Sequence, residues 1–276
     1  PLALQIGHAG RKASTQRPWE GRGPLLPHEA PWETLSPSGI PLSDAGPATR
    51  MMTEADMADV IDAHRSATAR AVRLGFEMVE LHAAHGYLLS TFLSPLSNVR
   101  ADAWGGSSEN RMRFPLEVVR AVRAELPSDR ALGVKVNGTD WAEGGLGPDD
   151  AVAFARALAD EGVDMVTMSG GGVVLSPPPA IEPGYQLEAA RRVKAAGIPI
   201  TVGAVGMFHE ADFAERVVAS GEADTIALAR AMLFDPRWGL RAAAQLGAEV
   251  PYPPQYERAA PAAWPPAAAL SERGRP

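Results

Sequence analysis

Short apolar runs alternate with amphipathic stretches along most of the chain. The first run, residues 2–6, stops at Gly7 and is typical of a strand buried on both faces. Between such runs, apolar residues recur with the period of a helix. The pattern predicts strands at residues 2–6, 76–81, 131–136, 163–168, 198–202 and 225–229. It predicts helices at residues 53–71, 107–126, 148–160, 186–196, 209–220 and 236–246.

The first of these helices carries a start signal. Thr53 is a favourable N-cap, and Asp56 follows three residues later. The apolar stripe of the helix consists of Met57, Val60, Ile61, Ala67 and Ala71. His64 falls on the same stripe, and we expect it at the edge.

Regular alternation of strand and helix predicts an α/β fold with a parallel sheet covered by helices. A doubly wound sheet and an eightfold (β/α)8 TIM barrel both satisfy this pattern. The last two strands end in Gly203 to Gly206 and in Ala229-Arg230, which favours the barrel, since barrels often bind phosphate in the loops after strands seven and eight. We therefore expect residues 1–250 to form units three to eight of a barrel, with two units preceding Pro1.

Two segments do not fit the alternation. Residues 16–52 contain seven prolines and far exceed the ~4–6-residue median connection, so we expect a functional cover or a disordered linker. Residues 251–276 again contain seven prolines, and we expect an extended C-terminal tail rather than core.

Charge and composition narrow the classes of function. Lys and Arg number 26 against 33 Asp and Glu, for a net charge of −7 and a pI near 5.4. That balance argues against nucleic acid and anionic membranes as partners. The chain has no cysteine, which excludes disulfides, a thiolate nucleophile and cysteine-based metal sites. With neither a long apolar run nor a signal sequence, we expect a cytoplasmic protein.

The segment from His82 to Tyr87 follows a predicted strand, where barrel enzymes place catalytic groups. His82 and His85 can donate to a substrate oxygen, and Tyr87 can deliver a proton. Alternatively, the two histidines satisfy local loop carbonyls. A metal site is a third interpretation, but His-x-x-His alone is a weak metal signal and we expect none.

Two other strands carry isolated polar residues. Gln5 ends the first strand and can read the edge of a heterocycle, or else satisfy polar groups inside the barrel. Lys135 interrupts an apolar strand, which is costly unless it faces an anion such as a reduced cofactor ring or reaches water with its head. Arg230, together with Gly203 and Gly206, indicates a phosphate site. Arg258 lies in the proline-rich tail, where the residues alone favour a solvated side chain.

Several of these motifs together resemble the Old Yellow Enzyme family. They are Gln5 with His8 to Ala13, His82 to Leu88, Phe92 to Pro95 through Asn98, Gly105-Gly106 and Glu109 to Arg111. The resemblance runs from Pro1 to about Arg258 and is nearest to the bacterial YqjM-like and xenobiotic-reductase-like ene-reductases.

The resemblance implies a barrel that holds FMN, takes electrons from NADPH or NADH, and reduces α,β-unsaturated carbonyl compounds. By position, His82 and His85 would bind the substrate oxygen and Tyr87 would protonate the α-carbon. Gln5 would contact the flavin pyrimidine edge. Lys135 stands where the family usually has an arginine, and Ala229-Arg230 where it has a phosphate-binding Gly-Arg pair, beside Gly203 to Gly206.

The resemblance also implies a homodimer or homotetramer, in which Arg258 reaches the substrate site of a neighbouring subunit. Three other interpretations stay open on sequence grounds. The chain could be a barrel fragment that only binds, one that does not fold, or a related FMN barrel with another reaction, such as oxidative demethylation or dienoyl-CoA reduction. The last two reactions often accompany iron–sulfur cysteines, which this sequence lacks.

Overall fold

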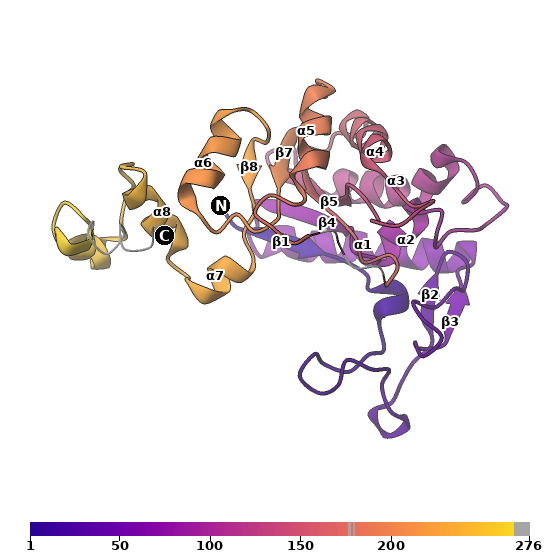
Figure 1. The fold of residues 1–276 in the computed structure, drawn as a ribbon. Helices are drawn as coiled ribbons and strands as arrows, with labels where there is room; N and C mark the ends of the chain where they lie inside the picture. The colour runs from indigo at the N-terminus through magenta and orange to yellow at the C-terminus, as the bar shows by residue number, and fades with distance from the viewer. Residues whose placement is uncertain (176–177, 179, 268–276) are drawn as a thin grey trace.

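Six parallel strands form the centre of the protein (Figure 1). The computed structural model describes residues 1–175, 178 and 180–267. The strands are β1 (Ala3–Ile6), β4 (Met78–Ala83), β5 (Ala131–Asn137), β6 (Met165–Ser169), β7 (Thr201–Ala204) and β8 (Thr225–Ile226). All six predicted strands are confirmed, although β8 is limited to two residues.

Helices follow the strands as the periodicity predicts. They are α1 (Glu54–Arg73), α2 (Leu88–Leu93), α3 (Ser108–Glu125), α4 (Pro148–Asp160), α5 (Leu187–Ala195), α6 (Ala211–Ala219), α7 (Arg230–Phe234) and α8 (Trp238–Gln245). The sequence did not indicate α2 and α7, because each is too short to complete two helical periods. Within the residues that the structure describes, no helix is long and apolar enough to cross a membrane.

The order of the strands distinguishes between the two predicted architectures. They pair as β1-β4-β5-β6-β7-β8, so each lies beside its successor in the chain. A doubly wound sheet reverses its strand order at a switch point, whereas a barrel keeps it sequential. The fold is therefore a partial (β/α)8 barrel, and among the described residues β1 and β8 are not paired with each other.

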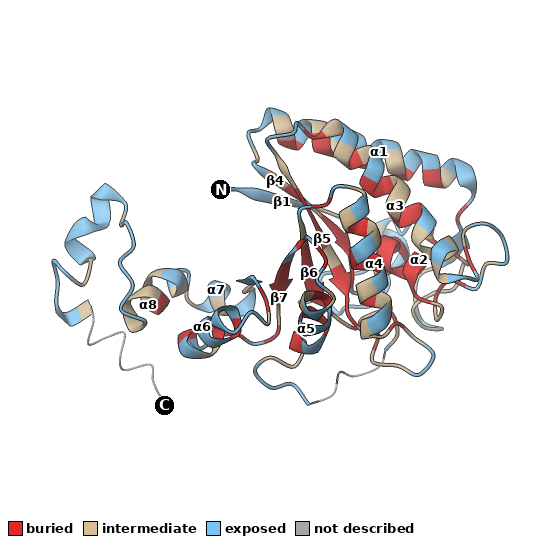
Figure 2. Cartoon of the chain, turned by 90° about the horizontal axis from the view of Figure 1, so that it is seen from above, coloured by how far each residue is buried: buried red, intermediate tan, exposed pale blue. Residues whose placement is uncertain are grey.

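The two faces of the sheet differ in chemistry because side chains alternate along a strand. Val79 and Leu81 of β4, like Val134 and Val136 of β5, point to the face that the helices cover, and all four are buried. Figure 2 shows α1, α3, α4 and α5 on that one side. The intervening positions carry polar groups on the opposite face, which are Gln5, Glu80, His82, Lys135, Thr167 and Ser169.

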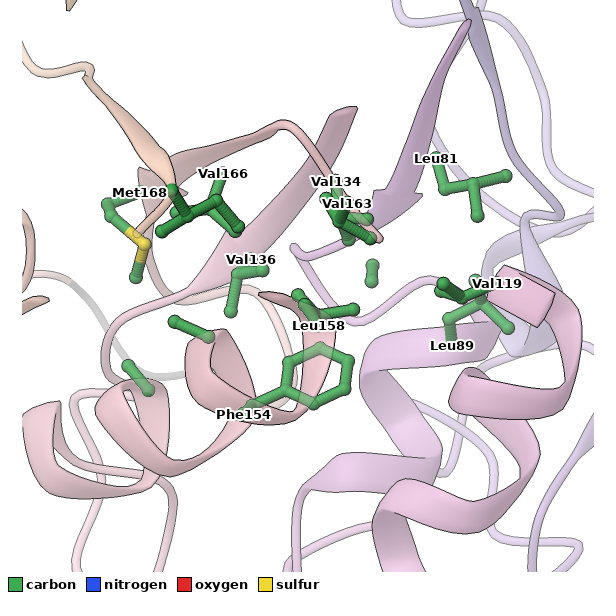
Figure 3. Packing of buried hydrophobic residues seen from close by; sticks show 14 of the residues in the cluster. Leu81, Leu89, Val119, Val134, Val136, Phe154, Leu158, Val163, Val166 and Met168 are labelled. Atoms are coloured by element: carbon green, nitrogen blue, oxygen red, sulfur yellow. The ribbon is translucent and has the colours of Figure 1, made fainter. Parts of the chain in front are cut away.

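The core lies between the sheet and these helices. Figure 3 shows Phe154 and Leu158 of α4 packed against valines of β5 and β6, such as Val134 and Val166. Leu158, Val166 and Phe114 are fully buried. Burying one such side chain stabilises the fold by ~1.5–3 kcal/mol, so this dry layer holds the strand ends in fixed positions.

Helix α1 begins where the sequence predicts. The Thr53 hydroxyl accepts from the Asp56 backbone N–H at 3.2 Å, and the Asp56 carboxylate accepts from the Thr53 N–H at 2.7 Å. The expectation for His64 is wrong, because its side chain is only 4% exposed. Its Nδ1–H donates to the Val60 carbonyl at 2.8 Å, and burial lowers the pKa of this imidazole.

The proline-rich segment before α1 is folded onto the body. It contains two short parallel strands, β2 (Thr34–Ser36) and β3 (Thr49–Met51). Arg11 donates to the carbonyls of Ile40 and Pro41 at 3.2 and 3.3 Å, and Arg100 donates to that of Pro37 at 2.7 Å. These bonds match the predicted cover rather than a linker.

The C-terminal segment leaves the body beyond α8 (Figures 1 and 2). A 3-10 helix, η3 (Pro254–Ala259), stands in this segment, so at these residues it is helical rather than extended. Residues 268–276 of the predicted tail lie outside the described residues. The division into a barrel at 1–250 and a tail at 251–276 stays a prediction.

Leu158→Ala is expected to lower the free energy of unfolding by ~2–5 kcal/mol, because it removes a fully buried side chain from a packed layer. Leu74→Ala is the matched control, since Leu74 is 76% exposed. Urea denaturation followed by circular dichroism measures both. Equal losses in the two variants would contradict the placement of the core.

Candidate active site

The carboxyl ends of three neighbouring strands bring the candidate groups together. Strand β4 leads through His82 into the loop with His85 and Tyr87. Strand β5 supplies Lys135, and β6 ends at Ser169. Lys135 pairs in register with His82 on one side, so residues distant in sequence share one rim of the sheet.

A tight turn orients the second histidine. His85 has φ +59°, a left-handed conformation that is uncommon outside glycine. Its backbone N–H donates to Asn137 Oδ1 at 2.9 Å, and its carbonyl accepts from Lys12 Nζ at 2.6 Å. At Gly86 a Cβ atom would come within 2.0 Å of the Gly172 carbonyl oxygen, so only glycine fits there. The turn is thus held from both sides.

The two imidazoles form one hydrogen-bonded series with Ser169 and Gln186. His82 Nε2 lies 3.2 Å from His85 Nδ1, and His85 Nε2 lies 2.7 Å from Ser169 Oγ. The Ser169 hydroxyl donates to Gln186 Oε1 at 3.1 Å. The rings meet edge to face, with centroids 5.0 Å apart. The histidines therefore contact each other and Ser169, and His82 also contacts local backbone at the Ala84 N–H and at its own carbonyl.

Both histidines are neutral at pH 7. Burial, reinforced by the charge of Lys135, lowers the pKa of His82 to about 4. Burial and the neighbouring His82 likewise lower the pKa of His85 to about 4. A neutral imidazole keeps one N–H donor and one acceptor nitrogen, so each ring can donate to an oxygen without carrying charge.

Tyr87 stands next to this pair as the N-cap residue of α2. Its ring packs edge to face on His82 with centroids 4.7 Å apart. Lys12 Nζ lies 5.7 Å from the centre of the Tyr87 ring, and burial, followed by the charge of Arg11, lowers the pKa of Lys12 to about 8. The phenol is thus fixed between an imidazole and a cation.

A cavity of about 580 Å³ opens beside the histidine pair. It is within the usual size of a small-molecule or cofactor site. Five of the predicted site residues line it, namely His85, Lys135, Gly206, Ala229 and Arg230. The structure brings these together from the ends of β4, β5, β7 and β8.

Other predicted residues lie outside the lining of the cavity. Gln5 is on the same sheet face, where its Nε2 donates to Glu80 at 2.5 Å. Gly203 packs beneath Met165, whose Cε a Cβ there would meet at 2.8 Å. Arg258 is in η3, in the segment that leaves the body. His82 and Tyr87 reach the cavity only through their contacts with His85 and each other.

Sequence reasoning missed several residues of the site. Ser169 and Gln186 line the cavity, Ser169 bonds to both His85 and Gln186, and Asn137 holds the His85 backbone. Glu80 orients the Gln5 amide and accepts from Thr167 at 2.7 Å. Ser169 directly follows the strand predicted at residues 163–168, which was the available signal, but serine and glutamine are too common at such places to stand out.

The donors around the cavity fit an anionic cofactor with a heterocyclic ring. Arg230 and the glycine turn at Gly206 offer a cation and backbone groups for a phosphate. Lys135 offers a second cation on a separate strand. Gln5 gives its amide N–H to Glu80, which leaves its Oε1 as the acceptor for a ring N–H. Among the described residues, no three His, Cys, Asp or Glu side chains form a cluster that could hold a metal ion.

A family model and curated proteins match this chain. The model of the "NADH:flavin oxidoreductase / NADH oxidase family" matches residues 2–249. The NADPH dehydrogenase of Geobacillus thermodenitrificans is 40% identical over 260 residues, which cover 93% of this chain and 70% of that protein. The NADPH dehydrogenase of Bacillus subtilis is 36% identical over 257 residues, with 93% and 70% covered.

Solved structures show the same fold. A 2-naphthoyl-CoA reductase in complex with 2-naphthoyl-CoA superposes with a TM-score of 0.72 at 29% identity, over 85% of this chain and 36% of that chain. Morphinone reductase superposes with a TM-score of 0.67 at 25% identity, over 92% of this chain and 67% of that one. The match to the family therefore extends from sequence to fold.

Acid is expected to destabilise the fold through the histidine pair. The folded pKa values of about 4 lie below the unfolded value of 6.5, so the unfolded chain binds protons first as the pH falls. The stability that the neutral pair supports is present above pH ~6.5 and is lost progressively toward pH 4. Urea denaturation at pH 7.5 and pH 5 measures this loss in the wild type and in a His82→Asn/His85→Asn double variant.

The wild type should lose more stability than the double variant between these two pH values. His28→Asn, at an exposed histidine, is the control and should behave like the wild type. If the double variant loses as much as the wild type, the neutral, buried state assigned to the pair is wrong.

Proposed function

The chain belongs to the NADH:flavin oxidoreductase / NADH oxidase family, and we propose that it reduces the C=C bond of α,β-unsaturated carbonyl compounds. FMN is the cofactor of this activity, and NADPH or NADH is the reductant. The observation that carries the proposal is the pair of neutral imidazoles, with Tyr87 packed on it, beside a cavity that His85, Lys135 and Arg230 line.

Residues on different strands would hold different parts of FMN. Arg230, Ala229 and Gly206 would hold the phosphate, and Lys135 would face the ring at its most electron-rich edge. Gln5, oriented by Glu80, would bond the pyrimidine edge. When bound, FMN supplies the hydride chemistry. The chain itself contributes binding, orientation and electrostatics.

The histidine pair would hold and polarise the carbonyl oxygen of the substrate. Two neutral N–H donors draw electron density from the β-carbon and stabilise the charge that develops on the oxygen. Each well-aimed donor of this kind contributes roughly 3 kcal/mol. Neutral rings suit this role, because Lys12 and Lys135 already supply positive charge nearby and disfavour a further cation.

Tyr87 would deliver a proton to the α-carbon. A phenol is a weak acid, but the carbon that it protonates is strongly basic once the oxygen is held as an enolate-like anion. Its contacts with His82 and Lys12 fix the ring, so the hydroxyl is positioned before substrate arrives.

Lys135 departs from the arginine that is usual in the family at this position. Lysine is a point charge without the planar fork of arginine, so it neutralises an anion but does not bond it in two places. We propose that this lowers flavin affinity or shifts its potential relative to relatives. The subunit pairing through Arg258 and the absence of nucleic-acid and membrane partners also stay proposals.

Arg230→Ala should weaken FMN binding roughly tenfold, ~1.4 kcal/mol, because it removes the side-chain cation of the proposed phosphate site. Riboflavin, which has no phosphate, should bind wild type and variant alike. Quenching of flavin fluorescence during titration measures both ligands. Arg156→Ala, at an exposed arginine of α4, is the control. If FMN and riboflavin weaken equally, Arg230 does not hold the phosphate.

Tyr87→Phe should slow reoxidation by cyclohexenone on the order of 100-fold, as expected when a general acid is lost. Reduction by NADPH should change little, because that half-reaction needs no proton from Tyr87. Stopped-flow absorbance of the flavin follows the two half-reactions separately. An equal loss in both would exclude Tyr87 as the proton donor, and a protein that takes up no FMN would overturn the proposed function.

A further inference from the structure

We propose that Ser169 and Gln186 are positioning residues that hold His85 as a single tautomer, with its proton on Nε2 at the wall of the cavity. The two residues are the far end of a hydrogen-bonded series that begins at the backbone of Ala84. The consequence for ligand binding rests on the proposed function, but the evidence for the tautomer is the hydrogen-bond geometry together with the burial of the two rings.

The direction of the whole series is set by a backbone amide. The Ala84 N–H, which can only donate, lies 3.2 Å from His82 Nδ1. We infer that this nitrogen accepts, so neutral His82 carries its proton on Nε2. The backbone carbonyl of His82 is the competing partner of the ring, and a bond to it would place the proton on Nδ1 instead. His82 Nε2–H then donates to His85 Nδ1 at 3.2 Å, which places the proton of neutral His85 on Nε2 as well.

The remaining two bonds continue in the same sense. His85 Nε2–H donates to Ser169 Oγ at 2.7 Å, and the Ser169 hydroxyl donates to Gln186 Oε1 at 3.1 Å. An amide carbonyl can only accept, so the series ends there. With the Ala84 N–H donating at one end and the Gln186 carbonyl accepting at the other, one arrangement of protons on two neutral rings makes all four bonds of the series.

The surroundings keep the series intact near neutral pH. The charged groups that act on the pair are Lys135 and Lys12, which disfavour imidazolium, and Glu80, which favours it at His82. Ser169 is 3% exposed and His82 8% exposed, so water competes weakly for their bonds. Gly206 allows Gln186 to approach, since a Cβ there would meet the Gln186 backbone nitrogen at 3.2 Å.

This arrangement defines which ligand atoms the site takes. His85 presents a donor, and the Ser169 oxygen occupies the position of its acceptor in the free protein. A ligand oxygen that replaces Ser169 must accept from His85 Nε2–H, as carbonyl, enolate and phenolate oxygens do. To bond both imidazoles, it must also displace His85 from His82. The chemical class that fits is thus a ligand with an acceptor oxygen.

Histidine-selective 15N NMR of the full chain at pH 7.5 tests the proposal. His82 and His85 should both show a protonated Nε2 and an unprotonated Nδ1, with a slowly exchanging Nε2–H proton on each. The His82→Asn variant identifies its signals by their loss. A protonated Nδ1 on either ring would overturn the inferred direction.

Ser169→Ala should speed the exchange of the His85 Nε2–H proton with water by at least about tenfold and leave the His82 Nε2–H proton protected. Ser169→Thr, which keeps the hydroxyl, should restore protection, and Gln186→Glu should retain it where Gln186→Leu does not. Ser66→Ala, at an exposed serine of α1, is the control and should change nothing. Unchanged exchange in Ser169→Ala would remove the positioning role.

The same samples separate this inference from the proposed function. Titration with FMN, read by fluorescence quenching, reports whether the chain takes the cofactor at all. If both rings are protonated on Nε2 but the chain takes up no FMN, the positioning role stands and the proposed function is wrong. If the chain takes up FMN but either ring is protonated on Nδ1, the proposed function stands and the positioning role is wrong.

Discussion

The alternation of side chains across a parallel sheet is the constraint on which the rest of this protein depends. Every second residue of β4, β5 and β6 must enter a layer sealed by helices, and those positions carry valine, leucine and methionine. The residues between them do not enter this core, so they can be polar, and they carry the polar groups of the site. Because the strands run parallel and in sequential order, their carboxyl ends meet at one rim, and the candidate chemistry gathers there.

Backbone geometry, more than side-chain packing, sets the orientation of the histidines. The left-handed turn at His85 depends on Gly86, where no Cβ fits, and on two bonds that hold its amide and its carbonyl. Such a conformation is unfavourable for a residue with a side chain, and it persists because Asn137 and Lys12 hold it from opposite sides. The amide of Ala84 then imposes a proton arrangement on both rings.

Electrostatics in this site favour donors without charge. Two lysines approach the imidazoles, and burial adds to their effect, so both rings stay neutral over the physiological range. A neutral ring can donate to an oxygen that gains negative charge while the nearby cations stabilise the same charge at longer range. Two cations line the cavity next to the pair at separate places. Arg230 begins α7, after β8, whereas Lys135 lies on β5, the strand beside the histidines.

The sequence by itself determined the order of the six strands and of the longer helices, and the α1 cap, because periodicity and capping are local properties. It favoured the barrel, and the observed strand order then distinguished the barrel from a doubly wound sheet. It also indicated His82, His85, Tyr87, Lys135 and Arg230, since charged or ionisable groups at strand ends have few structural reasons to be there. Only the tertiary structure decided that Ser169, Gln186 and Asn137 belong to the site, and that His64 is buried. Those placements depend on strand register and on loops that meet across more than fifty residues, and no local pattern encodes such a meeting.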